Sequence, residues 1–200
     1  MRIGIIAYGS LIINPGEELE QVIAERQTGL RTPFRVEFAR SSSTRNGAPT
    51  LVPVEHGGGY VECTLLVLSD GLVIDRVRDI VYRREIHKIS DQTTTYQPNP
   101  KNPNQVYIET IPEWGSVDLA MYTKISSNID NLTAERLAEL SIESVSVNDA
   151  TERNDGISYL IDAIRCGVRT PLTDDYIAQI LQKTGLSSLE EARNKLLSSD

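Results

Sequence analysis

A short turn that contains Gly9 and Ser10 follows the first apolar run of the sequence, and its composition is typical of an anion-binding loop. Residues 3–7 form a continuous apolar run, typical of a buried strand, and Tyr8, Gly9, Ser10 and Leu11 follow directly. Glycine permits unusual dihedral angles and a close approach of a ligand to the backbone. Successive exposed N–H groups in such a turn bind anions, so a carboxylate is the expected guest. The same residues also fit a plain turn between a strand and a loop.

Glu85 is the candidate proton carrier. It lies near the end of residues 72–87, where the apolar residues have helical spacing. An acid near a helix C-terminus meets the unfavourable end of the helix dipole, which could raise its pKa. A raised pKa suits a general base. The structural alternative is a surface glutamate paired with a neighbouring arginine, either Arg83 or Arg84.

Three further residues are candidates for holding a ligand. Arg40 and Ser41 begin a polar loop over residues 41–47, where Arg40 and Arg45 could clamp a carboxylate through bidentate hydrogen bonds. Tyr122 ends an expected strand and could present its hydroxyl group to the same ligand. Ordinary loop arginines and a buried tyrosine with a satisfied hydroxyl are the alternatives.

Other familiar catalytic and metal-binding patterns do not occur in the sequence. The two cysteines, Cys63 and Cys166, are far apart and lie in apolar settings, so we expect reduced core residues. With only two histidines, a structural zinc site lacks ligands. The three glycines 57–59 have no following lysine, and no Gly-x-Ser-x-Gly elbow exists. We therefore expect no metal site, no phosphate loop and no nucleophile elbow of these kinds.

The elements that must position these residues are strands first and helices last, which predicts an α+β fold. We expect one domain over residues 1–200 with a helical C-terminal portion over residues 156–200. The pattern predicts strands over residues 3–7, 34–39, 50–54, 60–68, 106–111 and 117–122. It predicts helices over residues 17–25, 72–87, 133–140, 156–165, 174–183 and 188–197, and a surface loop over residues 91–104.

Composition and charge narrow the class of protein. The chain has 200 residues, of which 40% are hydrophobic and 24% charged, which excludes a disordered chain, a collagen and a coiled coil. The net charge is −8, so nucleic acid and anionic membranes are poor partners. The sequence has no signal-peptide pattern and no run near the roughly 20 apolar residues of a membrane span, so we expect a cytoplasmic protein. The sequence does not decide the oligomeric state, and a homodimer is one of the states it allows.

Several segments together resemble the γ-glutamylcyclotransferase-like superfamily. Tyr8, Gly9, Ser10 and Leu11 resemble its Tyr-Gly-Ser signature. The Arg84-Glu85 pair, closing a helix, resembles the pair that holds the catalytic glutamate of the family. Residues 34–41, 47–53 and 61–68 are similar to its strands, and residues 166–176 to a motif that opens a helix. The resemblance spans most of residues 3–181.

The resemblance implies a small mixed β-barrel with flanking helices and an enzyme of glutathione metabolism, of transferase or lyase type. Its substrate would be a small γ-glutamyl amide or peptide, which cyclises to 5-oxoproline and releases an amine without a cofactor. Glu85 would carry the proton, and residues 8–11 would hold the substrate, helped by Arg40, Ser41 and Tyr122. Because a fold does not fix a function, a non-catalytic carboxylate-binding or regulatory protein is the alternative, and another amide transfer or hydrolysis is a third.

Overall fold

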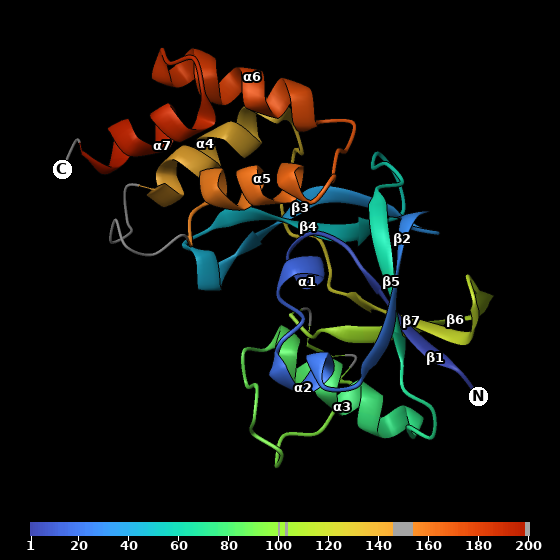
Figure 1. The fold of residues 1–200 in the computed structure, drawn as a ribbon. Coiled ribbons are helices and arrows are strands. Elements are labelled where there is room, and N and C mark those ends of the chain that lie inside the picture. The colour runs from blue at the N-terminus through green and yellow to red at the C-terminus, as the bar shows by residue number, and fades with distance from the viewer. Residues whose placement is uncertain (100, 103, 146–153, 199–200) are drawn as a thin grey trace. The chain divides into compact units, whose positions relative to one another are not determined.

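The computed structural model describes residues 1–99, 101–102, 104–145 and 154–198 (Figure 1). The chain divides into two compact units. The first comprises Met1–Thr32 and Glu62–Ser126, and the second comprises Pro33–Val61 and Ser127–Asp200. The prediction of a single domain stays a prediction, because the division into compact units does not by itself count domains.

The first unit is built on a five-stranded mixed sheet with the order β2-β5-β1-β7-β6. The central strand β1 pairs antiparallel with β5 and parallel with β7, while β2 pairs antiparallel with β5 and β6 antiparallel with β7. The strands are β1 (Ile3–Ala7), β2 (Ile23–Arg31), β5 (Glu62–Leu68), β6 (Tyr107–Trp114) and β7 (Val117–Lys124). Three helices belong to this unit, α1 (Ser10–Ile13), α2 (Glu17–Glu20) and α3 (Ile74–Glu85).

The core of the first unit lies between α3 and the sheet. The apolar residues of α3 recur at helical spacing, so Val77, Ile80 and Val81 share one buried face. They join a cluster that includes Ile5 of β1 and Met121 of β7, both with no exposed surface. This packing fixes the direction of α3 against the sheet and therefore the place of its last residue, Glu85.

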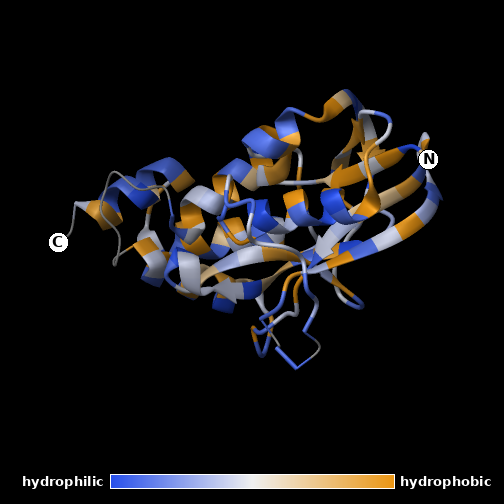
Figure 2. Ribbon diagram, turned by 90° about the horizontal axis from the view of Figure 1, so that it is seen from below, coloured by the Kyte–Doolittle hydropathy of each residue, from blue (hydrophilic) through white to orange (hydrophobic). Residues whose placement is uncertain are grey.

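The second unit combines a two-stranded sheet with four helices. The strands β3 (Arg35–Ser42) and β4 (Ala48–Val54) pair antiparallel, and a short 3₁₀ turn, η1 (Ser43–Arg45), connects them. The helices are α4 (Ala134–Val145), α5 (Gly156–Arg165), α6 (Thr173–Thr184) and α7 (Leu189–Leu197), and they carry both hydrophobic and hydrophilic residues (Figure 2).

Aromatic contacts join the strands of the second unit to its helices. The ring of Phe38 on β3 meets the rings of Tyr159 and Tyr176 edge to face, with centroids 6.4 and 5.5 Å apart. Buried Tyr176 is also hydrogen-bonded to Ser141 of α4, and burial raises the pKa of its phenol. Since these contacts tie α4, α5 and α6 to one strand, they define the core of this unit.

Most predicted elements are confirmed, with one clear error. The predicted bounds of α3, α5, α6 and α7 lie within two residues of the observed bounds. Helix α4 continues five residues beyond its expected end at residue 140. The helix predicted over residues 17–25 is wrong, because α2 ends at Glu20 and Ile23 begins strand β2. Strand β3 also continues to Ser42, through the start of the loop expected over residues 41–47.

The α+β class is confirmed, as a mixed sheet with flanking helices. In the pairings of the described residues, β2 contacts only β5 and β6 contacts only β7, so these pairings do not close the five strands into a barrel. The narrower expectation of a barrel therefore stays a prediction. In the part of the chain that the structure describes, no helix has the length and apolar character needed to cross a membrane.

Candidate functional site

The turn after β1 has the backbone geometry that its sequence predicts. Gly9 has φ 58° and ψ −133°, in the left-handed range of φ that favours glycine. The N–H of Ile12 donates to the carbonyl of Gly9 at 3.1 Å, which begins the single helical turn of α1. Ser10 is exposed, whereas the side chain of Leu11 is buried in the core. Ser10 can therefore contact a ligand with its side chain, whereas Leu11 can do so only through its backbone.

Glu85 is the last residue of α3 and pairs with the arginine that precedes it. Arg84 Nη1 donates to Glu85 Oε1 at 2.7 Å, and the side chains of Arg84 and Glu85 are 17% and 21% exposed. The charge of the carboxylate is therefore compensated by a direct, mostly buried ion pair. This is the arginine pairing that the sequence leaves as an alternative.

The same guanidinium reaches the turn after β1. Arg84 Nη2 donates to the hydroxyl of Ser10 at 3.3 Å and to the carbonyl of Asn14 at 2.9 Å, and Arg84 Nε donates to that carbonyl at 3.2 Å. Two segments about seventy residues apart in the chain thus meet at one side chain. The structure brings Ser10 and Glu85 together, with Arg84 as the link between them.

Arg83 points elsewhere and holds the chain that follows Glu85. Its guanidinium forms a bidentate contact with Glu18, with Nη2 at 2.5 Å from Oε2 and Nε at 3.0 Å from Oε1. Arg83 Nη1 donates to the carbonyl of Thr94, and the N–H of Ser90 donates to Glu18 at 2.8 Å. The hydrogen bond from Arg83 lowers the pKa of Glu18 and raises the pKa of Arg83. Sequence reasoning missed Glu18, since only the tertiary fold places it beside Arg83.

Tyr122 lies on β7 in the first unit, opposite Glu109 of β6. Its side chain is half-buried, and both burial and the nearby charge of Glu109 raise the pKa of its phenol. The hydroxyl is therefore protonated at neutral pH and able to donate a hydrogen bond. The role of Tyr122 at the site stays a prediction.

Arg40 and Ser41 lie in the second unit, near the end of β3. The Ser41 hydroxyl donates to the carbonyl of Gly47 at 2.8 Å, and its N–H donates to Asn128 Oδ1 at 2.7 Å. Ser41 therefore has a structural role in the hairpin of β3 and β4. Arg40 is half-buried, and burial lowers the pKa of its guanidinium. Whether either residue meets a ligand stays a prediction.

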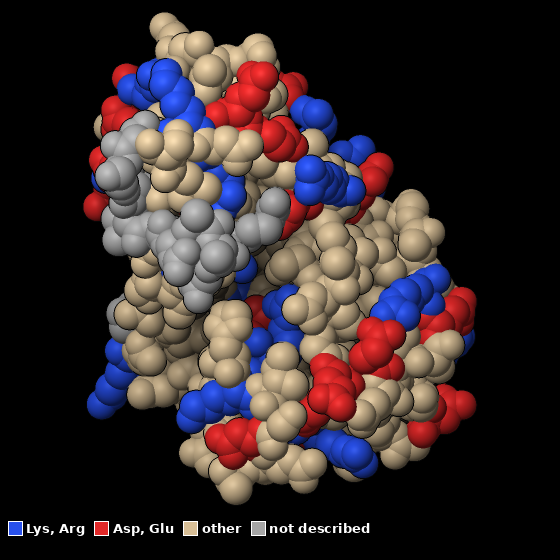
Figure 3. Space-filling model, turned by 60° about the vertical axis from the view of Figure 1, so that its left-hand side comes forward, with Lys and Arg blue, Asp and Glu red and all other residues tan. Residues whose placement is uncertain are grey.

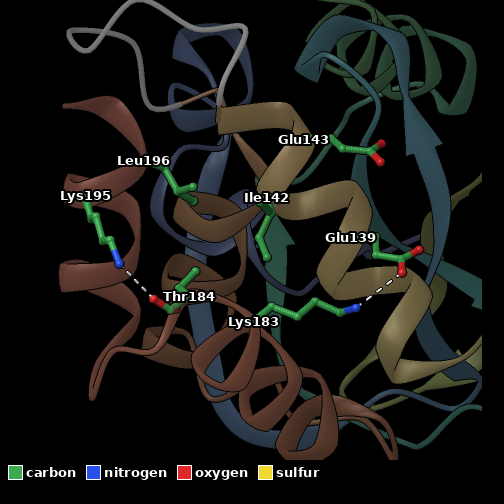
Figure 4. Close-up of a pocket in the computed structure, with 7 residues that line it drawn as sticks. All are labelled: Glu139, Ile142, Glu143, Lys183, Thr184, Lys195 and Leu196. Atoms are coloured by element: carbon green, nitrogen blue, oxygen red, sulfur yellow. Dashed lines mark hydrogen bonds and ion pairs between the residues drawn. The ribbon is translucent and has the colours of Figure 1, made fainter. Parts of the chain in front are cut away.

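The second unit also has a pocket of about 350 Å³ between α4, α6 and α7 (Figure 4). Ile142 and Leu196 supply its apolar lining. Its two lysines are engaged, because Lys183 pairs with Glu139 at 3.3 Å and Lys195 donates to the carbonyl of Thr184 at 3.1 Å. With both lysines held by other groups of the chain, the pocket indicates no particular class of ligand.

The described residues give no candidate metal site. Acidic and basic side chains lie interspersed on the face shown in Figure 3. Within the described ranges, no group of three or more His, Cys, Asp or Glu side chains is arranged to hold a metal ion. Comparison of the sequence with models of protein families and with curated proteins found no match.

Proposed function

We propose that this chain cyclises a γ-glutamyl amide or peptide to 5-oxoproline and releases the amine. The proposal includes the small β-barrel fold of the γ-glutamylcyclotransferase-like superfamily. The observation that carries it is the position of Arg84, which contacts both the Ser10 hydroxyl and the Glu85 carboxylate. The two segments with the most specific resemblance to that family thus share one side chain.

The reaction needs little from a protein beyond positioning and one proton carrier. The α-amine of the substrate attacks its own γ-carbonyl carbon, a C–N bond forms, and the C–N bond to the leaving amine breaks. Holding the substrate folded back on itself supplies much of the rate enhancement, because the attack is intramolecular. Backbone N–H groups of residues 8–11 would hold the α-carboxylate. Glu85 would take a proton from the α-ammonium and deliver it to the leaving nitrogen.

A non-catalytic binding protein is the second candidate, and the ion pair favours it. In the structure Glu85 already has a charged partner in Arg84 at 2.7 Å. A carboxylate whose charge is compensated can serve to fix the turn for binding an anion instead of moving a proton. The two functions differ in the product, because only the enzyme forms 5-oxoproline.

The test is mass-spectrometric detection of 5-oxoproline from γ-glutamyl amino acids, γ-glutamyl amines and glutathione. Wild type is compared with Glu85→Gln and with Glu17→Gln, a matched control at an exposed acid of the same unit. We expect Glu85→Gln to lose about 10²-fold or more of the rate, the usual effect of removing a proton carrier, and the control to keep it. Equal rates in all three proteins would refute the role of Glu85. A folded wild type that binds a γ-glutamyl compound without forming product would establish the second candidate instead.

A further inference from the structure

The first unit has a cavity that is lined by none of the residues that form the Ser10, Arg84 and Glu85 contacts. Its volume is about 340 Å³, and it lies beside the N-terminal half of α3. Its lining side chains are Asp75, Arg78, Asp79, Tyr96, Pro98 and Ile108. The first three come from one face of α3, since positions three and four residues apart are neighbours on a helix.

Arg78 lines this cavity and has one hydrogen-bond donor without a partner. Its Nη1 donates to Asp75 Oδ1 at 3.1 Å, which fixes the guanidinium on the surface of α3. Its Nε is buried and has no hydrogen-bond partner in the described structure. Buried donors almost always have a partner, and this one belongs to a side chain that lines the cavity, so an acceptor bound there could complete its hydrogen bonding. A carboxylate is the best match, because it accepts two hydrogen bonds from a guanidinium.

Asp79 presents a carboxylate, which accepts hydrogen bonds, to the same cavity. Its Oδ1 accepts the backbone N–H of Tyr96 at 2.7 Å, which holds the carboxylate in place. Within the part of the chain that the structure describes, its second oxygen forms no hydrogen bond. Arg83 interacts electrostatically with Asp79 but is itself neutralised by Glu18. An ammonium group would therefore find an ordered carboxylate here.

The opposite wall is apolar and ordered. The hydroxyl of Tyr96 accepts the N–H of Ile108 at 3.0 Å, and its ring packs edge to face on Tyr82 with centroids 5.4 Å apart. Pro98 and Ile108 extend this wall. Because Tyr96 is held at its N–H, ring and hydroxyl, the wall exists before any ligand arrives. Such preorganisation lowers the cost of binding.

We propose that this cavity binds a free α-amino acid as a zwitterion. The carboxylate of the ligand would accept from Arg78, its ammonium would donate to Asp79, and an aliphatic side chain would lie along Tyr96, Pro98 and Ile108. A volume of about 340 Å³ is within the range of small-molecule sites and exceeds that of one aliphatic amino acid. The site does not depend on the cyclisation reaction, so either proposal can fail alone.

Isothermal titration of the full chain with three related compounds tests the ligand chemistry. L-leucine carries both charged groups, isopentylamine lacks the carboxylate and N-acetyl-L-leucine lacks the ammonium. We expect L-leucine to bind with a Kd of about 1 mM or tighter and both analogues to bind at least about tenfold more weakly. Absent binding of L-leucine, or equal binding of either analogue, would overturn the proposal.

Two conservative variants test the location. Asp79→Asn removes the charge but keeps an oxygen for the Tyr96 N–H, and Arg78→Lys keeps the charge but removes Nε. Each should weaken L-leucine binding at least about tenfold. The matched controls, Asp70→Asn and Arg76→Lys at exposed positions of the same unit, should leave it unchanged. Unchanged affinity in the two site variants would place any bound amino acid elsewhere. If one variant fails to fold, as seen by circular dichroism, the other and the three-compound comparison still decide.

Discussion

Asp155 and Arg193 form a buried ion pair that joins the beginning of α5 to α7. Arg193 Nε donates to Asp155 Oδ2 at 2.7 Å, and the two side chains are 10% and 0% exposed. Asp155 is also the N-cap of α5, since its Oδ1 accepts the N–H of Ser158 at 2.7 Å and its Oδ2 accepts the Ser158 hydroxyl at 2.8 Å. One carboxylate therefore serves two elements, and its removal has two separate costs.

The substitution Asp155→Ala should lower the free energy of unfolding by about 4 to 6 kcal/mol. Loss of an N-cap costs about 1 kcal/mol. Leaving a buried arginine without its partner costs a further 3 to 5 kcal/mol or so, because the cost of desolvating the charge is no longer offset. The total is a large fraction of the roughly 5–15 kcal/mol that stabilises an ordinary domain.

A double substitution separates this reasoning from a general loss of packing. Arg193→Met removes the charge but keeps an unbranched apolar side chain, so Asp155→Ala with Arg193→Met should cost less than Asp155→Ala alone. Urea unfolding followed by far-UV circular dichroism measures all the variants. Glu190→Gln, at the exposed contact of Glu190 with Arg165, is the control and should unfold like wild type. A double variant that is less stable than Asp155→Ala would refute the account, because the stranded charge would then not be the main cost.

Two further predictions concern the core of the second unit. Glu37 is fully buried and burial raises its pKa above the ordinary value of 4.5, so the native state resists ionisation. The stability that neutral Glu37 contributes is complete below the unfolded-state pKa and is lost as the pH rises through the raised native value. Urea unfolding between about pH 4 and pH 8 should therefore show Glu37→Gln gaining stability over wild type as the pH rises, and a constant difference would contradict this. Gly156→Ala should lower the free energy of unfolding by about 1–3 kcal/mol, because its Cβ would lie 2.4 Å from Ser141 Oγ and 2.8 Å from Ser141 Cα. A stabilised variant in the same assay would mean that α4 and α5 separate at little cost and that the higher helix propensity of alanine prevails.

The sequence predicts best where local chemistry decides the structure. Ser188 followed by Glu191 predicts a helix start, and in the structure Ser188 Oγ accepts the N–H of Glu191 at 3.2 Å. The run over residues 3–7 is apolar at every position but Gly4, and it forms β1, whose residues are all buried. In both places the signal lies within a few residues, so no distant partner is needed to read it.

The false helix over residues 17–25 shows where such signals fail. Glu17 to Glu20 does form one helical turn, but Ile23 begins an edge strand whose residues are all exposed or half-buried. A strand that buries little has no strong alternation of apolar and polar residues. Its pairing with β5 decides its conformation, and that pairing is a tertiary contact.

The candidate site depends on a choice between two adjacent arginines. Arg83 and Arg84 both lie within two residues of Glu85 in the sequence, but consecutive residues of a helix point about 100° apart. The fold places Glu18 on the side of Arg83 and the turn at Ser10 on the side of Arg84, so Arg84 alone is directed to the turn. The direction of Arg84, the direct partner of Glu85, therefore follows from residues 10–18, which only the tertiary fold brings to the end of α3. For the same reason the proposed chemistry belongs to the contact between α3 and the turn after β1, and a change in either segment should alter it.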